Sequence, residues 1–209
     1  MVMNERDPQI TLSVLNVVEK NSHVTQRDVA KDIGIALGLT NAYLKRCIKK
    51  GLIKVQQVPA NRYAYFLTPK GFSEKSRLTA EYLSQGFQFF RIARKQLMEI
   101  FETCQNRNWH NIALHGLTDI CEIAVLSAQN FEVNIVGIVD KSSSLAEYSG
   151  IPILDSIEKL GVVDAIVITD VGDPDASLKY LSGFYPGSHL FVPEILKLSG
   201  KIRVEEAET

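Results

Sequence analysis

Side chains suited to contacting a nucleic acid recur between residues 41 and 49. Asn41, Lys45, Arg46 and Lys49 are spaced so that they share one face of a helix. An amide can read an adenine edge, whereas Lys and Arg bind guanine or the phosphate backbone. The spacing therefore predicts a polar, basic helix face of the kind that enters the major groove of duplex DNA.

Two short helices separated by a tight turn are predicted to position these side chains. Thr25 is a good N-cap, and Asp28 three residues later completes a capping box with Asp in place of Glu. Gly34 can take the left-handed conformation of a sharp turn, and a second helix is predicted from about residue 37 to residue 50. Ala36 stands where a capping Ser is expected. The second helix has four apolar positions for its inner face, Leu37, Leu44, Cys47 and Ile48, and Thr40 completes the row at a spacing of three and four.

A β-hairpin is predicted directly after the two helices. Residues 52–57 and 62–67 have strand composition, and residues 58–61 read as the turn. A helix-turn-helix followed by a hairpin is a winged helix, which weakens the alternative of two packed helices with a solvated polar face. Further DNA contacts are predicted from Gln26 and Arg27 at the start of the first helix, and from Asn61 and Arg62 in the wing. Double-stranded DNA is the predicted partner.

Residues 10–83 resemble the MarR-type winged-helix regulators associated with exopolysaccharide gene clusters. The resemblance is carried by TQRDVAKDIGIALGLTNAYLKRCIKKGLIKV, by YFLTPKG after the wing, and by EKSRLTAEYL. It covers a little over a third of the chain. The resemblance implies a winged-helix fold and a role in transcription of polysaccharide-related genes.

The net charge of −1 conceals a strong division along the chain. Residues 1–77 contain 13 Lys and Arg against 6 Asp and Glu, a net charge of +7. Residues 78–108 have a net charge of +1, from 4 basic and 3 acidic residues, and residues 109–209 have −9, from 6 and 15. This division favours phosphate contacts by the first part only.

A long helix is predicted between residues 78 and 106. Its apolar side chains recur with heptad-like spacing: Leu83, Phe87, Phe90, Leu97, Phe101 and Cys104. The stripe can pack on its own chain or on a second copy, and we favour a homodimer formed through residues 78–106. We therefore expect a DNA-binding domain (1–77), a linking and dimerisation helix (78–108), and a C-terminal domain (109–209).

Strands alternate with helices in the C-terminal domain. This alternation predicts a parallel sheet of about five strands covered on both faces, so the chain is α/β overall with an α+β winged helix in front. Ligands bind such sheets beyond the carboxyl ends of the strands, where the strand order reverses. The candidate ligand-binding residues are Gly116, Leu117, Thr118, Asp119, Asp140, Lys141, Asp170 and Val171.

The dinucleotide-binding signature is incomplete at this edge. Gly116 can form the tight turn, and Asp140 lies 24 residues later, near the place of a ribose-binding carboxylate. Thr118 and Cys121 replace the second and third glycines, and Asp119 would repel a phosphate. No Tyr has Lys four residues later, so the acid–base pair of short-chain dehydrogenases is absent. We therefore predict neither an enzyme nor an assigned cofactor.

The C-terminal domain resembles the small Rossmann-like domains of nucleotide-sugar-modifying proteins. The resemblance is carried by NIALHGLTDICEIAVLSAQ, VNIVGIVDKS and GIPILDSIEKLGVVDAIVITD. It implies a Rossmann-like domain and makes a nucleotide or nucleotide sugar the candidate effector. His115 is a titrating group near the expected cleft, and we interpret it as a turn or surface residue.

The cysteine pattern and the apolar runs bear on metal binding, membrane contact and location. The three cysteines, Cys47, Cys104 and Cys121, match no metal spacing, and no metal site is predicted. No signal segment appears, and no apolar run approaches the roughly 20 residues of a membrane span, so we expect a cytoplasmic protein without membrane contact.

Three functional hypotheses remain from the sequence. We favour a dimeric transcriptional regulator whose C-terminal domain senses a small molecule or a partner. The first alternative is an enzyme of nucleotide-sugar metabolism with an appended winged helix. The second is a winged helix that contacts proteins, joined to a degenerate Rossmann-like scaffold.

Overall fold

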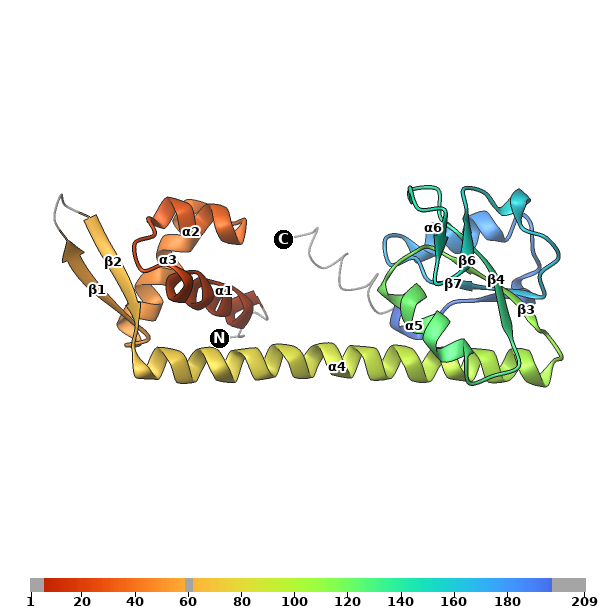
Figure 1. Cartoon of the computed structure of the whole chain (residues 1–209), viewed down its shortest axis with the longest axis horizontal. Helices are drawn as coiled ribbons and strands as arrows, with labels where there is room; N and C mark the ends of the chain where they lie inside the picture. The colour runs from red at the N-terminus through yellow and green to blue at the C-terminus, as the bar shows by residue number, and fades with distance from the viewer. Residues whose placement is uncertain (1–5, 59–61, 197–209) are drawn as a thin grey trace. The chain divides into compact units, whose positions relative to one another are not determined.

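The computed structural model describes residues 6–58 and 62–196. The chain divides into two compact units, Met1–Phe87 and Gln88–Thr209, which are described separately (Figure 1). One helix, α4 (Pro69–Asn106), contributes residues to both units. Within the described ranges, no helix is both long enough and apolar enough to cross a membrane.

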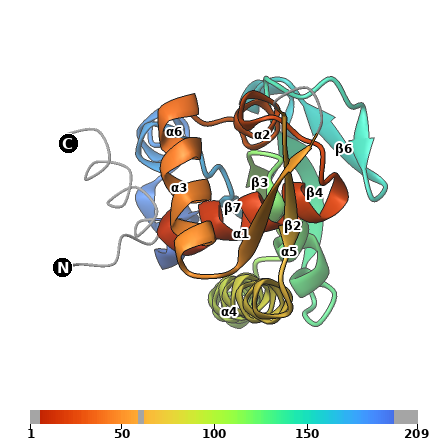
Figure 2. The same ribbon diagram turned by 90° about the vertical axis from the view of Figure 1, so that its left-hand side faces the viewer.

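Unit 1 consists of a helical cluster and a two-stranded hairpin (Figure 2). Its elements are α1 (Arg6–Lys20), α2 (Gln26–Ile33), α3 (Leu37–Lys49), β1 (Ile53–Val58), β2 (Arg62–Leu67) and the first part of α4. The two strands pair antiparallel, with Ile53 opposite Leu67 and Val58 opposite Arg62. This order is that of a winged helix, as the sequence predicts, and α3 holds the place of the recognition helix.

The turn between α2 and α3 forms as predicted. The Thr25 hydroxyl accepts a hydrogen bond from the Asp28 amide at 3.2 Å, and the Asp28 carboxylate accepts one from the Thr25 amide at 3.0 Å. Gly34 ends α2 with a φ of 69°, in the left-handed region. Both ends of α2 are therefore satisfied by local interactions, which fixes the direction in which α3 begins.

The inner face of α3 differs in part from the sequence prediction. Its buried residues are Thr40, Tyr43, Leu44 and Cys47. Leu37 is 39 % exposed and Ile48 is 37 % exposed. The predicted burial of these two is wrong because they lie at the margins of the 3.6-residue stripe, whereas Thr40 and Tyr43 lie nearer its centre. Tyr43 is buried within this inner face.

Ala36 caps α3 without a side-chain hydrogen bond. We expect Ala36→Ser to raise the free energy of unfolding by about 1 kcal/mol, because a hydroxyl at the N-cap accepts a bond from a free amide of the first turn. Urea unfolding of the full chain measures this change. Ala42→Ser, at an exposed position inside the same helix, is the matched control and should lower stability slightly. Equal effects of the two substitutions would refute the capping explanation.

The start of α4 is fastened to the segment that joins α3 to β1. The Thr68 hydroxyl donates a hydrogen bond to the Gly51 carbonyl at 2.6 Å, and the Gly71 amide donates one to the Thr68 hydroxyl at 3.0 Å. The backbones approach so closely that a Cβ at residue 71 would lie 2.1 Å from the Leu52 carbonyl oxygen. The TPKG sequence thus joins the end of the recognition helix to the first turn of α4.

Unit 2 is built on a six-stranded sheet. Its strands are β3 (Asn111–His115), β4 (Asn134–Val139), β5 (Glu147–Tyr148), β6 (Ile151–Leu154), β7 (Ala165–Ile168) and β8 (Leu190–Phe191). The helices are α5 (Asp119–Ala128), α6 (Pro174–Leu181), the last part of α4, and the short 3-10 turns η1 (Ile157–Lys159) and η2 (Gly187–His189). The sheet order is β5-β6-β4-β3-β7-β8.

Five of these strands run parallel, in the order of a doubly wound sheet. The chain builds outward from β3 through β4 to β6, then crosses to the other side of β3 for β7 and β8. The strand beyond the predicted five is β5, which pairs antiparallel with β6. Ser149 and Gly150 connect the two with φ values of 53° and 78°, as a tight two-residue hairpin turn requires. The strand order reverses between β3 and β7.

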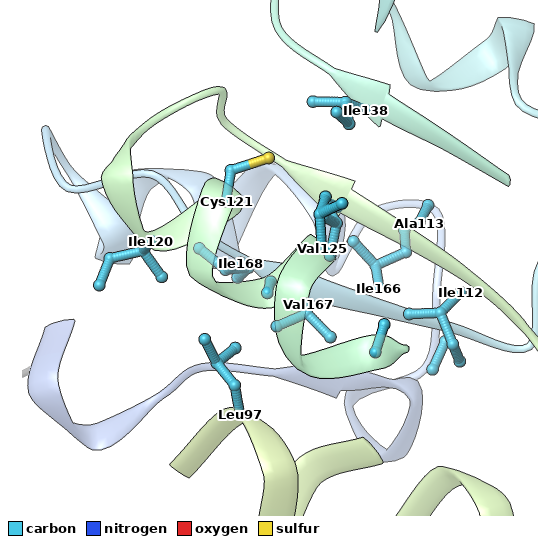
Figure 3. Close-up of a cluster of buried hydrophobic side chains, with 14 of the residues drawn as sticks. Leu97, Ile112, Ala113, Ile120, Cys121, Val125, Ile138, Ile166, Val167 and Ile168 are labelled. Atoms are coloured by element: carbon cyan, nitrogen blue, oxygen red, sulfur yellow. The ribbon is translucent and has the colours of Figure 1, made fainter. Parts of the chain in front are cut away.

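The core of unit 2 includes one face of α4. Ala93, Leu97, Phe101 and Cys104 have no exposed surface and belong to the same cluster as the strands and α5. Figure 3 shows Leu97 beside side chains of the sheet and α5. The predicted seam for a second copy is therefore wrong at Leu97, Phe101 and Cys104, which pack on their own chain. Leu83, Phe87 and Phe90 in the same helix are exposed.

The cysteines provide a test of this packing. Burial raises the pKa of Cys47 and Cys104 to about 11 and that of Cys121 to about 12. We therefore expect a thiolate-specific disulfide reagent at mildly alkaline pH to leave the folded chain essentially unmodified, because neither thiolate nor access is available. In denaturant the same reagent should titrate all three thiols. Rapid stoichiometric labelling of the folded chain would contradict the described core.

Candidate nucleic-acid interface

The outward face of α3 carries exposed cations. Lys45, Arg46 and Lys49 are all exposed, and Lys50 follows at the C-cap. The Arg46 guanidinium carbon lies 5.2 Å from the centroid of the Tyr43 ring. Because Tyr43 is buried, this contact holds the guanidinium against the helix surface while leaving it exposed. The predicted cationic residues of the recognition helix are therefore brought together on one accessible surface.

Asn41 occupies a different position from these cations. It is half-buried, and its Oδ1 atom is buried without a hydrogen-bond partner among the described residues. An unpaired buried amide oxygen costs about 1–3 kcal/mol. To read a base, the side chain would have to turn outward from this position. The predicted role of Asn41 in base recognition stays a prediction.

Sequence reasoning missed the small residues at the front of the recognition helix. Gly38 and Ala42 are exposed and precede Lys45 by seven and three residues, which places them on the same outward face, and a Cβ at residue 38 would meet no atom within 4 Å. Small side chains let a helix backbone approach base edges closely. Leu39 is 44 % exposed beside them and has the chemistry to contact a thymine methyl group. The sequence signal that could have located these small residues is helical spacing, because they share a helix face with Lys45.

The start of α2 supplies Gln26 and Arg27. Arg27 is exposed, and the Gln26 amide nitrogen donates a hydrogen bond to the Tyr65 hydroxyl at 3.2 Å. The helix N-terminus itself is occupied by the capping box, where hydrogen bonds from Thr25 lower the pKa of Asp28. The Asp28 carboxylate at this helix end would repel a phosphate, so the predicted phosphate contacts depend on the side chains of Gln26 and Arg27.

A hollow of about 650 Å³ lies between the start of α2, the start of α3 and strand β2. Besides Gln26 and Arg27 it is lined by His23, Leu37 and Tyr63. Tyr63 is 56 % exposed on the wing strand. The hairpin is anchored here by a 2.8 Å hydrogen bond from the Tyr65 amide to the Ser22 carbonyl. His23 and Tyr63 join the candidate interface only through this folding, since no sequence motif marks them.

The wing holds two of the predicted DNA-contact residues, Asn61 and Arg62. Arg62 begins β2 opposite Val58. Asn61 lies outside the described residues. Their predicted contacts with phosphate or the minor groove stay predictions.

The second set of predicted residues lies where β3, β4 and β7 end. These strands are neighbours in the sheet, so the turns that follow them share one edge. Gly116 has a φ of 99°, and a Cβ there would lie 2.7 Å from the Cα and N atoms of Asp170. The turns after β3 and β7 are therefore in backbone contact, and only glycine fits at residue 116.

Asp140 is occupied by hydrogen bonds from its own chain. One carboxylate oxygen accepts from the Leu117 amide at 2.8 Å, and the other accepts from the amide and hydroxyl of Ser142 and from the Ser143 amide. Burial raises the pKa of this carboxyl, but the hydrogen bonds outweigh it and leave the pKa lowered. A ribose hydroxyl at Asp140 would have to replace one of these donors.

The neighbouring residues are also engaged. The Thr118 hydroxyl donates to the Thr169 carbonyl at 2.5 Å, and one Asp170 oxygen accepts from the Ser177 hydroxyl at 2.8 Å. The Thr118 hydroxyl also caps α5. Three other predicted residues surround this network: Asp119 and Lys141 are exposed, and Val171 is half-buried. The structure thus gathers the predicted residues at one edge, where their polar groups mainly brace the turns.

His115 ends β3 beside this network. Its Nδ1 atom is buried without a hydrogen-bond partner in the described part of the chain, and its ring centroid lies 6.3 Å from that of Tyr180. Burial lowers the pKa of His115, against the opposing effect of Asp170 and Asp140. It is therefore more enclosed than the turn or surface residue expected from the sequence. Across the described residues, no cluster of three or more His, Cys, Asp or Glu side chains is suited to hold a metal ion.

A comparison with protein families agrees with the architecture of unit 1. Residues 8–54 match the family of winged helix-turn-helix DNA-binding domains, which covers most of α1, all of α2 and α3, and the beginning of β1. The structure of the multiple antibiotic-resistance repressor (MarR) from Listeria monocytogenes 4b F2365 is similar, with 22% sequence identity and a TM-score of 0.31. That similarity covers 58% of this chain and 67% of that chain. A comparison with curated proteins found no match. The N-terminal part of the chain is a winged helix-turn-helix.

Proposed function

We propose that this protein is a DNA-binding transcriptional regulator and not an enzyme. The observation that carries the proposal is the placement of Lys45, Arg46 and Lys49 on the exposed face of the recognition helix, in the segment that matches winged helix-turn-helix DNA-binding domains. Gln26 and Arg27 lie at the start of α2. Side chains from two helices therefore contact the phosphates of one duplex. We also propose that the protein acts in the cytoplasm.

Selection from a random duplex library tests this function. The full chain, immobilised and washed at moderate salt, is expected to enrich one sequence family over successive rounds. Specific regulators prefer their own site over random DNA by about 10³-fold or more, which repeated selection detects readily. Recovery of an unchanged random pool, or no recovered DNA, would refute the regulator. A protein-contact role for the winged helix predicts the latter result.

We further propose that the protein regulates polysaccharide-related genes and that unit 2 senses a nucleotide or nucleotide sugar. The resemblances of the two halves of the sequence support this specification. The binding edge is formed by residues 116–119, 140–141 and 170–171, where the strand order reverses. Native mass spectrometry of the purified protein, followed by DNA titration with and without saturating nucleotide sugar, tests it. An unchanged DNA affinity would exclude an effector role for that compound, and turnover of it would instead favour the enzyme.

The regulator is proposed to act as a homodimer through the helix at residues 78–106. Paired winged helices read two half-sites, so the selected sequence is expected to contain a repeat. Since Leu97, Phe101 and Cys104 are used within unit 2, the dimer contact must involve other faces of this helix.

A further inference from the structure

An open groove of about 530 Å³ runs along α4 in unit 2. Phe90, Met98 and Phe131 supply its apolar lining. Charged side chains, among them Arg91 and Glu102, complete it. A groove with an apolar lining and charged margins is suited to an amphipathic helix that inserts a large apolar side chain.

A side chain of this kind is present on the same helix. Phe87 is 61 % exposed, more than any other large hydrophobic residue described in α4. Phe90, Arg94 and Met98 follow it at three, seven and eleven residues, and these intervals keep all four on one helix face. The exposed aromatic ring and the groove therefore lie in line along α4.

We propose that a second copy of this chain packs antiparallel on α4, with Phe87 of each copy seated in the groove of the other. The inference rests on the homodimer of the proposed function and specifies its contact. A two-fold axis between residues 90 and 91 places Phe87 of one copy opposite Arg94 of the other, at the middle of the groove. Because the contact is isologous, the two-fold rotation that fills one groove also fills the other.

The charges of α4 select the antiparallel direction. In this register Arg91, Arg94 and Lys95 lie opposite the uncharged residues Phe90, Phe87 and Gly86. In a parallel pair each of the three cations would face its own copy, and each groove would face the other groove. Like charges in direct opposition are unfavourable, whereas an arginine beside an aromatic ring is favourable.

Cysteine cross-linking distinguishes the two directions, since the native cysteines are all buried. Arg91→Cys is expected to form a disulfide dimer efficiently because residue 91 lies next to the axis. Leu83→Cys is expected not to, because the two copies of residue 83 are about 22 Å apart along the helices. The double variant Leu83→Cys with Met98→Cys should cross-link again. Efficient cross-linking of Leu83→Cys alone would overturn the antiparallel contact.

Substitution of the inserted ring gives a second readout. Phe87→Glu is expected to raise the dissociation constant of the dimer by about 30-fold or more in sedimentation experiments. Leu145→Glu, 56 % exposed in the loop before β5, is the matched control and should leave the constant unchanged. A wild-type chain that binds DNA but sediments as a monomer overturns this inference and leaves the DNA-binding function standing. A cross-linked antiparallel dimer that binds no DNA supports this inference and refutes the DNA-binding function.

Discussion

Replacing Lys45, Arg46 and Lys49 together with alanine is expected to weaken duplex DNA binding by about a thousandfold, since each charge-assisted contact contributes about 1.5 kcal/mol. All three side chains are exposed on the outward face of α3. The slope of log K against log salt should also become shallower by about 2.7 if all three contact phosphate, because about 0.9 is lost per contact on B-DNA. Fluorescence anisotropy with a labelled duplex at several salt concentrations measures both quantities.

The slope separates base contacts from phosphate contacts within this set. A single variant that loses affinity without a change in slope identifies a base contact, whereas one that loses about 0.9 in slope identifies a phosphate contact. The control replaces Lys159 and Lys179, two exposed lysines of unit 2, and is compared with the double variant of Lys45 and Lys49, which changes the net charge equally. Its affinity should stay within about twofold of the wild type, since these side chains lie outside the proposed interface. Equal losses in the two double variants would show that only total charge matters.

Gly71→Ala is expected to disrupt unit 1 severely. The added Cβ would lie 2.1 Å from the Leu52 carbonyl oxygen, an atom of the backbone that cannot move aside without shifting β1. Overpacking in a well-packed region typically costs about 1–3 kcal/mol, and a clash between backbones belongs at or above that limit. The same shift would break the hydrogen bonds of Thr68 to Gly51 and Gly71. Thermal unfolding of the full chain should show a lower Tm for unit 1, together with weakened DNA binding.

Gly86→Ala is the matched control in the same helix. A Cβ at residue 86 would meet no atom within 4 Å. Alanine is favoured over glycine inside a helix by about 1 kcal/mol, so this variant should be as stable as the wild type or more stable. If Gly71→Ala unfolded at the wild-type temperature, the described junction between β1 and α4 would be incorrect.

Local chemistry accounts for the features of unit 1 that the sequence predicts correctly. The Thr25–Asp28 capping box and the left-handed Gly34 depend on residues within a few positions of each other. The same is true of the hairpin and of the cationic face of α3. Each follows from backbone geometry and helical periodicity, without knowledge of distant contacts.

Tertiary context accounts for what the sequence did not reveal. Leu83, Phe87, Phe90, Leu97 and Phe101 follow one heptad-like pattern, yet only the last two are buried against the sheet. Periodicity identifies an apolar face but not the surface that covers it. Similarly, Asn41 lies at the margin of the outward face, where a few degrees of helix rotation decide between burial and exposure.

The sheet edge where β3, β4 and β7 end shows the same limit: the sequence locates its residues but not their contacts. Its residues could be located from the sequence because each follows a predicted strand, and the sheet order brings them together. Their hydrogen bonds could not be predicted. Asp140 accepts from Leu117, across 23 residues, and Thr118 donates to the Thr169 carbonyl, across 51 residues. Such contacts exist only after the parallel strands pair.

Titration of the full chain with a random-sequence duplex over increasing salt tests the central claim most directly. We expect measurable binding at about 50 mM salt, and a linear fall of log K with log salt whose slope is about −4 or steeper, from about five cationic contacts by α2 and α3. Absence of binding at that salt concentration, or an affinity that does not change with salt, would contradict a cationic DNA-facing surface on unit 1.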